Sequence, residues 1–171
     1  MNKFLLIVIS VVLSVALAKV ILPSLFISFQ FEPEAMLFIA QVLGLIMMLV
    51  NGTFTDTLYF KISLFALIII FLGAALKILH YAGADQTIVI SFPMIPILYL
   101  IHFVSKKEKG HLDILKLLTV FAFFITPLLL FLHLVSRDYA SSIRIFNQAI
   151  FWLTFADFLA MGLTRRTLFR D

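Results

Sequence analysis

Long apolar runs separated by short polar breaks dominate the chain. Each run is close to the roughly 20 residues that a helix needs to cross the hydrocarbon core of a bilayer, which is about 30 Å thick. Six such runs occur, at about 4–23, 35–52, 60–80, 87–104, 115–135 and 145–163. The pattern predicts an all-α, polytopic membrane bundle. We expect one integral membrane domain, residues 1–171, arranged as three hairpins at about 1–52, 60–104 and 115–163.

Prolines occur inside two of these predicted spans. Pro93 and Pro96 fall in the fourth, and Pro127 follows Thr126 in the fifth. Within a membrane, neighbouring helices and Ser/Thr side chains can satisfy the carbonyls that proline leaves without a donor. We therefore expect kinks at these positions rather than helix ends.

The composition agrees with a membrane protein and excludes several kinds of chemistry. Hydrophobic residues make up 63% of the chain and charged residues only 13%, against about 25% charged residues in soluble domains. The absence of cysteine excludes disulfides, thiolate metal sites and cysteine nucleophiles. The sequence contains no HExxH, GxSxG or glycine-rich phosphate motif. We expect no enzyme activity, no cofactor and no metal site.

Lysine and arginine concentrate on one side of the predicted topology. Six spans place both termini on the same side as the loops near 53–59 and 105–114. This side holds Lys3, Lys106, Lys107, Lys109, Arg165, Arg166 and Arg170. The opposite side holds Glu32, Glu34, Asp85, Arg137, Asp138 and Arg144. The positive-inside rule then predicts a multi-pass protein of a bacterial inner membrane with both termini in the cytoplasm.

The basic residues do not indicate a nucleic-acid partner. The net charge is +4, but the lysines and arginines lie at the predicted membrane boundaries rather than on one face. The partner that this distribution indicates is the lipid bilayer.

The first 18 residues allow a second interpretation. They have a basic start, an apolar centre and an Ala16-Leu17-Ala18 ending, which is typical of a cleavable signal peptide. Cleavage there would leave five spans. The apolar character continues through 20–31 without a polar mature start, which favours an uncleaved first helix.

Two spacing patterns suggest that the hairpins are related. Lys3 and Lys19 are separated by the same distance as Lys61 and Lys77. In the second pattern a histidine that follows a leucine precedes an aspartate by five residues, at His80–Asp85 and again at His133–Asp138. These matches indicate either parallel hairpin repeats or coincidence in a sequence of low complexity.

The two lysines near the ends of predicted spans are candidate functional residues. Lys19 and Lys77 each lie about one turn from the outer end of their span. Such side chains commonly run along apolar surface and deliver the ammonium to the headgroups. The alternative is an ion pair with an acid of the outer loops, Glu32 or Glu34 for Lys19 and Asp85 for Lys77.

His80 and Asp157 are the other polar candidates. Because His80 follows Lys77 by three residues, we expect both on one helix face. His80 is then either an interfacial anchor or a proton-handling group, but the returning helix 87–104 carries no acid for a relay. Asp157 lies inside the sixth span, where it either pairs with Arg165, Arg166 or His102 or forms an ion site. We expect Gln41 and Asn147 to make hydrogen bonds between helices.

The string GAALKILHYAGAD, residues 73–85, resembles the first-helix motif of GldL-like proteins, the inner-membrane subunits of gliding-motility and type 9 secretion motors. The matching positions are Gly73, Ala74, Lys77, His80, Tyr81, Gly83, Ala84 and Asp85. In that family the lysine and histidine belong to a proton-coupled membrane core that works with a partner subunit. The resemblance implies a GldL-like hairpin at about 60–104. The glutamate of the family's second helix and its long cytoplasmic tail have no counterpart in this sequence.

Two functions remain as hypotheses. The first is a non-catalytic structural or accessory component of the membrane that associates with other membrane subunits or with copies of itself. The alternative is a small transporter or a proton- or ion-conducting channel subunit that uses Lys77 and His80. The two differ in whether these side chains face a watery interior or the outside of the bundle.

Overall fold

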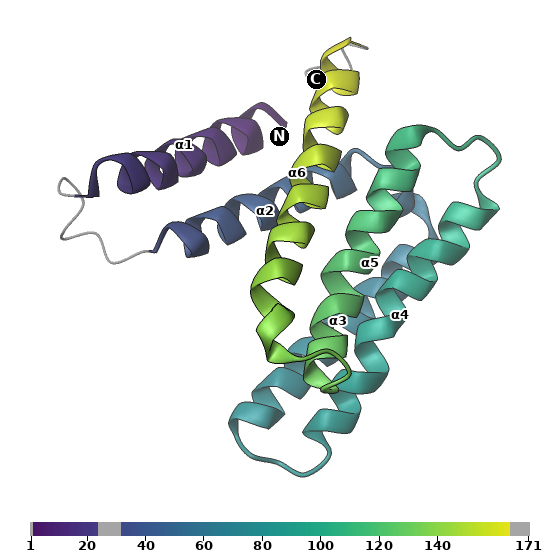
Figure 1. The fold of residues 1–171 in the computed structure, drawn as a ribbon. Helices are drawn as coiled ribbons and strands as arrows, with labels where there is room; N and C mark the ends of the chain where they lie inside the picture. Colours follow the sequence, from purple (N-terminus) through teal and green to yellow (C-terminus); the bar gives the residue numbers. More distant parts are fainter. Residues whose placement is uncertain (1, 24–31, 165–171) are drawn as a thin grey trace. The chain divides into compact units, whose positions relative to one another are not determined.

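The computed structural model describes residues 2–23 and 32–164, and within them every regular element is a helix. The six α-helices are α1 (Asn2–Ile21), α2 (Pro33–Val50), α3 (Leu58–Ile78), α4 (Ala84–Ser105), α5 (His111–Phe131) and α6 (Ala140–Thr164) (Figure 1). All six are long and apolar enough to cross a membrane. The predicted all-α polytopic fold is therefore confirmed.

The helix bounds differ from the predicted spans by up to five residues. The largest single difference is at the start of α6, which begins at Ala140 rather than at 145. The whole of α5 is shifted by four residues, because it begins at His111 and ends at Phe131, whereas the apolar run extends over 115–135. Its charged first turn is helical because the Asp113 side chain accepts a hydrogen bond from the Gly110 backbone N–H. Pro93, Pro96 and Pro127 lie inside helices, so the expectation that they do not end the spans is confirmed.

The chain forms two compact units, and the division between them falls inside α6. The first unit comprises Met1–Gly52 and Phe155–Asp171. In it, α1 and α2 pack side by side with Ile9, Ala16 and Ala40 buried. The open end of this hairpin is closed by Asn2 and Asn51, whose side-chain amides donate to each other at 2.8 and 3.0 Å.

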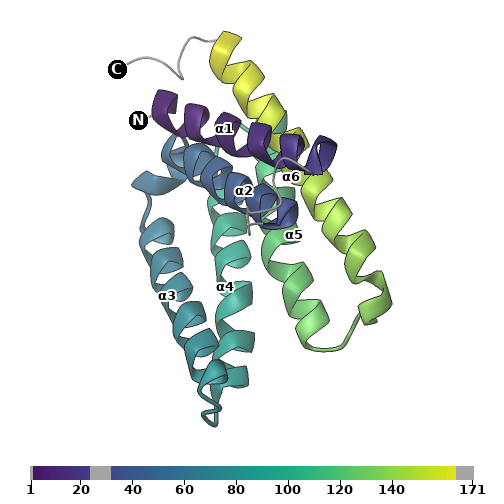
Figure 2. The same ribbon diagram turned by 90° about the vertical axis from the view of Figure 1, so that its left-hand side faces the viewer.

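The second unit comprises Thr53–Thr154, and its central feature is the antiparallel pair α3 and α4 (Figure 2). Small residues on α3, namely Ser63, Ala66 and Gly73, are buried. A Cβ atom built on Gly73 would lie 2.9 Å from Ile88 Cγ1 of α4. The two backbones thus approach closely, as helix pairs in membranes do where small residues line the contact.

Hydrogen bonds join α5 to the part of α6 that belongs to the second unit. The hydroxyl oxygens of Thr119 and Thr154 are 2.7 Å apart and buried. Asn147 Nδ2 donates to the Ala122 carbonyl at 3.2 Å, so the interhelical bond expected of this asparagine is confirmed. For Gln41 the structure shows a buried side chain on α2.

Large apolar side chains cover the outside of the helices. Phe71 is 68% exposed, Ile90 67% and Phe146 61%. Exposed apolar surface on every span is favourable in the hydrocarbon of a bilayer, but in water its exposure costs free energy. The chain is an integral membrane protein.

Candidate functional site

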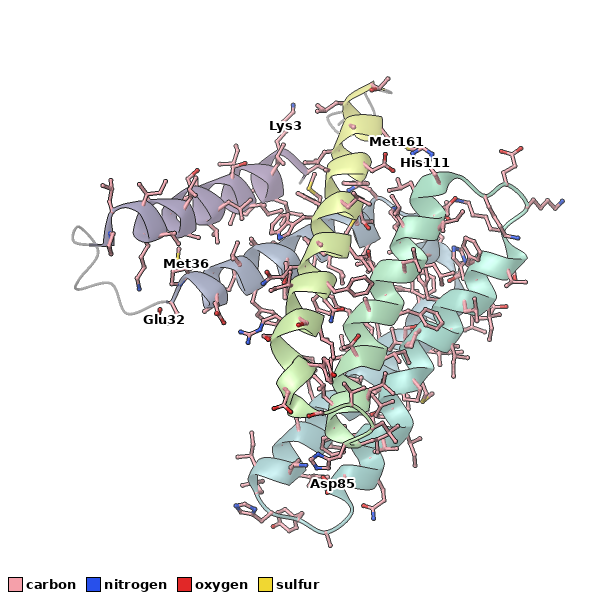
Figure 3. All side chains as sticks on the ribbon, in the orientation of Figure 1. Lys3, Glu32, Met36, Asp85, His111 and Met161 are labelled. Carbon is pink, nitrogen blue, oxygen red and sulfur yellow. The ribbon has the colours of Figure 1, made fainter. Side chains whose placement is uncertain are left out.

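The residues that the sequence singles out most strongly meet at one end of the second unit, at the turn from α3 to α4. We call residues 77–85 the α3–α4 tip. Asp85 lies at this tip, and His111 lies at the opposite end of the same unit (Figure 3). The tip therefore occupies one end of the α3–α4 pair, away from the α4–α5 loop.

An ion pair and an aromatic contact hold Lys77 at the tip. Its Nζ lies 2.9 Å from Asp85 Oδ1 and 4.0 Å from the centroid of the Phe131 ring. Lys77 is in the last turn of α3, Asp85 in the first turn of α4 and Phe131 at the end of α5. The ammonium of this α3 residue thus contacts α4 and α5. Of the two alternatives for Lys77, the structure shows the ion pair with Asp85.

The ion pair lies at the surface of the unit. The Lys77 side chain is 49% exposed and the Asp85 side chain 64%. Each charge also interacts favourably with the dipole of its own helix, because Lys77 is a cation at the C-terminus of α3 and Asp85 an anion at the N-terminus of α4. The pair stabilises the hairpin without enclosing a polar interior.

His80 ends α3 instead of lying on its face. Its φ is +58°, its N–H donates to the Lys77 carbonyl at 3.1 Å, and the Tyr81 N–H donates to the Leu76 carbonyl at 2.9 Å. These two bonds form a Schellman cap, in which the left-handed residue is usually glycine. The expectation that Lys77 and His80 share a helix face is wrong, because α3 ends at Ile78 and Leu79 is its C-cap.

The same cap ends α5. His133 has φ +55°, its N–H donates to Leu130, and the Leu134 N–H donates to Leu129. The pattern of leucine, histidine and a later aspartate therefore marks two helix ends of one geometry. The aspartates themselves differ, since Asp85 opens α4 whereas Asp138 lies in the short 3-10 helix η3 (Arg137–Tyr139) and accepts from Ser136.

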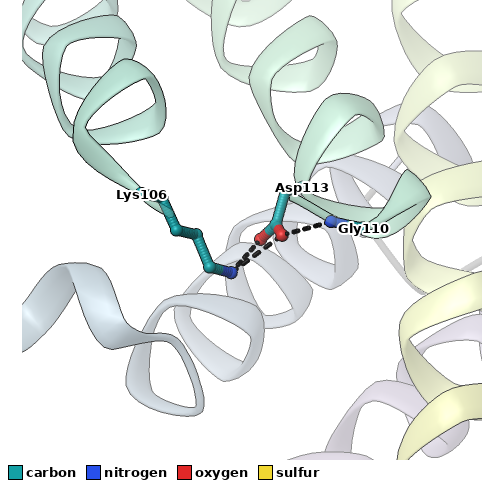
Figure 4. Close-up of polar contacts among 3 residues, drawn as sticks. All are labelled: Lys106, Gly110 and Asp113. Carbon is teal, nitrogen blue, oxygen red and sulfur yellow. Dashed lines mark hydrogen bonds and ion pairs between the residues drawn. The ribbon is translucent and has the colours of Figure 1, made fainter. Parts of the chain in front are cut away.

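The opposite end of the second unit is fixed by a second ion pair, which the sequence analysis did not propose. Lys106 Nζ lies 2.7 and 2.8 Å from the two carboxylate oxygens of Asp113, and the Gly110 N–H donates to Asp113 Oδ2 at 3.0 Å (Figure 4). Lys106 is the C-cap of α4 and Gly110 the N-cap of α5. The pair spans the α4–α5 loop and sets its shape.

An aromatic cluster lies against the same end of α4. Phe54, in the 3-10 helix η2 (Thr53–Asp56), is buried. Its ring centroid is 5.1 Å from Tyr99, 5.2 Å from His102 and 5.8 Å from Phe60. These edge-to-face contacts hold the segment before α3 against α4.

Lys19 and Asp157 belong to the first unit. Lys19 is half-buried in the last turn of α1, and Asp157 lies in α6 with its Oδ2 atom buried. The arginines proposed as partners of Asp157, Arg165 and Arg166, lie outside the described residues. Of the five candidates, Lys77, His80 and Asp85 lie together at the α3–α4 tip of the second unit.

The described residues include no group of three or more His, Asp and Glu side chains placed to hold a metal ion. No protein-family model, curated protein or solved structure matches the chain. The geometry of the α3–α4 tip is therefore the basis for a proposed function.

Sequence reasoning missed the residues whose partners come from other helices. Phe131 and Phe54 are two among many phenylalanines, so nothing in the sequence distinguishes them. Asp113 did carry a signal, because an acid three residues after a glycine N-cap is the second half of a capping box. Only that half is formed here, since glycine has no side chain to complete it.

Proposed function

We propose that this protein is a non-catalytic structural or accessory component of a bacterial inner membrane, with both termini in the cytoplasm. The observation that carries the proposal is the bonding of Lys77, a charged residue in the last turn of α3. Its ammonium contacts Asp85 and Phe131, and these contacts hold the end of α3 to the ends of α4 and α5. The group that a proton or ion path would need is thus engaged in the fold.

The position of the α3–α4 tip also supports a structural or accessory role. Groups that line a conduction path face the interior of a bundle or a watery cavity. Lys77 and Asp85 are instead about half exposed at the end of the hairpin, and His80 is exposed beyond the last turn of α3. A transporter or channel that uses these side chains is the less favoured alternative.

Five of the eight positions that carry the resemblance have a structural explanation. Gly73 allows α4 to approach, Lys77 pairs with Asp85, and His80 and Gly83 take left-handed conformations with φ +58° and +89°. These five residues build a tight helical hairpin. We propose that the likeness reflects shared hairpin architecture rather than shared proton chemistry.

The proposed orientation rests on the two loops of the second unit. The α4–α5 loop carries Lys106, Lys107 and Lys109, whereas residues 79–83 of the α3–α4 turn carry no lysine or arginine. The positive-inside rule then assigns the lysine-rich loop to the cytoplasm. With six spans, both termini lie on that side.

A proton-flux measurement tests the proposal. Purified protein is reconstituted into liposomes that contain a pH-sensitive dye, and a pH gradient and a membrane potential are imposed. We expect wild type, Lys77→Ala and His80→Ala to leak protons at the rate of protein-free liposomes. A protein-dependent flux that Lys77→Ala or His80→Ala abolishes, while the lipid-facing control Phe71→Ala retains it, contradicts the proposal and favours the transporter alternative.

A further inference from the structure

The Lys106–Asp113 pair fixes the shape of the α4–α5 loop, in which two other lysines make no ion pair with the described residues. Lys106 Nζ donates hydrogen bonds to both carboxylate oxygens of Asp113, at 2.7 and 2.8 Å. Lys107 and Lys109 are exposed, and neither makes a hydrogen bond or ion pair with any residue that the structure describes. The internal pair therefore orders the loop while two of its three lysines remain available.

An aromatic residue ties one of these lysines to the edge of the apolar span. Lys109 Nζ lies 5.4 Å from the ring centroid of Phe103, which is in the last turn of α4. Lysines at the ends of membrane helices run their stems along apolar surface and deliver the ammonium to the headgroups. The Phe103 contact places Lys109 at such a helix end.

The acids of the loop do not cancel its charge. Asp113 is occupied by Lys106, and the remaining acid, Glu108, stands between Lys107 and Lys109 in the sequence. The segment 106–113 therefore keeps an excess of one positive charge, with three lysines against two acids. The α3–α4 tip offers no such surplus, because Lys77 is paired with Asp85.

We propose that Lys107 and Lys109 form a binding surface for the phosphodiester headgroups of anionic lipids in the leaflet that borders the α4–α5 loop. Lysines at a membrane surface attract anionic lipids with about 1 kcal/mol each, or about fivefold in affinity. The ordered loop lowers the entropic cost of binding, since the backbone that carries the two lysines is already fixed by the Lys106–Asp113 pair. A lipid is favoured over free phosphate because the apolar span beside Phe103 accommodates acyl chains. This inference does not depend on the proposed function.

Native mass spectrometry of the full chain in detergent tests this surface. Delipidated protein is titrated with phosphatidylglycerol and, separately, with phosphatidylcholine of the same acyl chains. We expect wild type to prefer phosphatidylglycerol, and the double variant Lys107→Gln/Lys109→Gln to lose about 25-fold of that preference, fivefold for each lysine. The charge-conserving Lys107→Arg/Lys109→Arg variant retains it.

Two controls make the result decisive. Lys61→Gln removes an exposed lysine from the first turn of α3 and is expected to reduce the preference by at most about fivefold, the general effect of one surface lysine. Glycerol phosphate added in excess is expected not to displace the lipid. The proposal is overturned if the double glutamine variant keeps the wild-type preference, if Lys61→Gln reduces it as strongly, or if glycerol phosphate displaces the lipid.

Discussion

His80 and His133 have the same backbone conformation at the ends of α3 and α5, with φ of +58° and +55°. Each follows a leucine C-cap and donates its N–H to the carbonyl three residues earlier. Among residues other than glycine, histidine is one of the few that are enriched in this left-handed region. The relationship explains why the leucine–histidine pattern occurs twice, since it is a signal that ends a helix.

Replacing either histidine by glycine is expected to stabilise the protein slightly. A side chain in the left-handed region costs about 1–2 kcal/mol, which glycine avoids at an entropic cost of about 0.5–1 kcal/mol. His80→Gly and His133→Gly should therefore leave the free energy of unfolding unchanged or raise it by up to about 1 kcal/mol. Denaturant titration in micelles measures this quantity.

The control for this prediction is Ala75→Gly, an exposed position inside α3. It should lose about 1 kcal/mol, because glycine is a poor helix former. A similar loss in His80→Gly would show that residue 80 needs its imidazole rather than its backbone conformation.

The close approach of α3 and α4 makes Gly73 sensitive to size. A Cβ there would lie 2.9 Å from Ile88 Cγ1 and 3.4 Å from the Ile88 backbone nitrogen. Gly73→Leu should destabilise the protein by at least about 1–3 kcal/mol through overpacking. The neighbouring Ala74 is exposed, so Ala74→Leu should be tolerated. Equal thermal shifts for the two variants would contradict the close packing of α3 against α4.

Substitutions at the buried pair Thr119 and Thr154 should have non-additive effects on the free energy of unfolding. Thr119→Val removes the hydroxyl–hydroxyl bond between the helices, while Thr154 keeps its bonds to the Ile150 and Leu115 carbonyls. Bonds of this kind in membranes contribute about 0.6–1.7 kcal/mol. The double variant Thr119→Val/Thr154→Val should cost less than the sum of the two single changes, because both partners are replaced by groups of the same shape.

Thr164→Val provides a matched comparison, since the Thr164 hydroxyl bonds only to Ala160 of its own helix in the described residues, at 2.7 Å. It should have little effect on the free energy of unfolding. Additive losses at Thr119 and Thr154 would show that the two hydroxyls do not act together.

The proposed orientation is directly testable because the chain contains no cysteine. Single variants Tyr81→Cys, in the α3–α4 turn, and Lys107→Cys, in the α4–α5 loop, place one thiol at each end of the second unit. A maleimide that cannot cross membranes should label Tyr81→Cys in intact spheroplasts, and Lys107→Cys only after permeabilisation. The reverse result would place the termini outside the cytoplasm.

The fold was predictable from the sequence to within five residues at each helix end, because the length of an apolar run reports directly on a membrane span. The pairing of Lys77 with Asp85 was also predictable, since a short turn brings their two helix ends together. The contact of Lys77 with Phe131 was not, because it depends on how α5 packs and one phenylalanine resembles another. The placement of His80 on the face of Lys77 was wrong for a local reason: helical spacing was extended one residue beyond Leu79, the C-cap of α3.

The measurement that most directly tests the central claim, that Lys77 serves to hold the hairpin together, is a double-mutant cycle on Lys77 and Asp85. The free energy of unfolding in micelles is determined for wild type, Lys77→Gln, Asp85→Asn and the double variant. Because the pair is partly exposed, we predict a coupling energy of about 0.2–1 kcal/mol, with a larger single effect for Lys77→Gln, which also loses the Phe131 contact. A coupling energy of zero, with Lys77→Gln as stable as wild type, would contradict the claim.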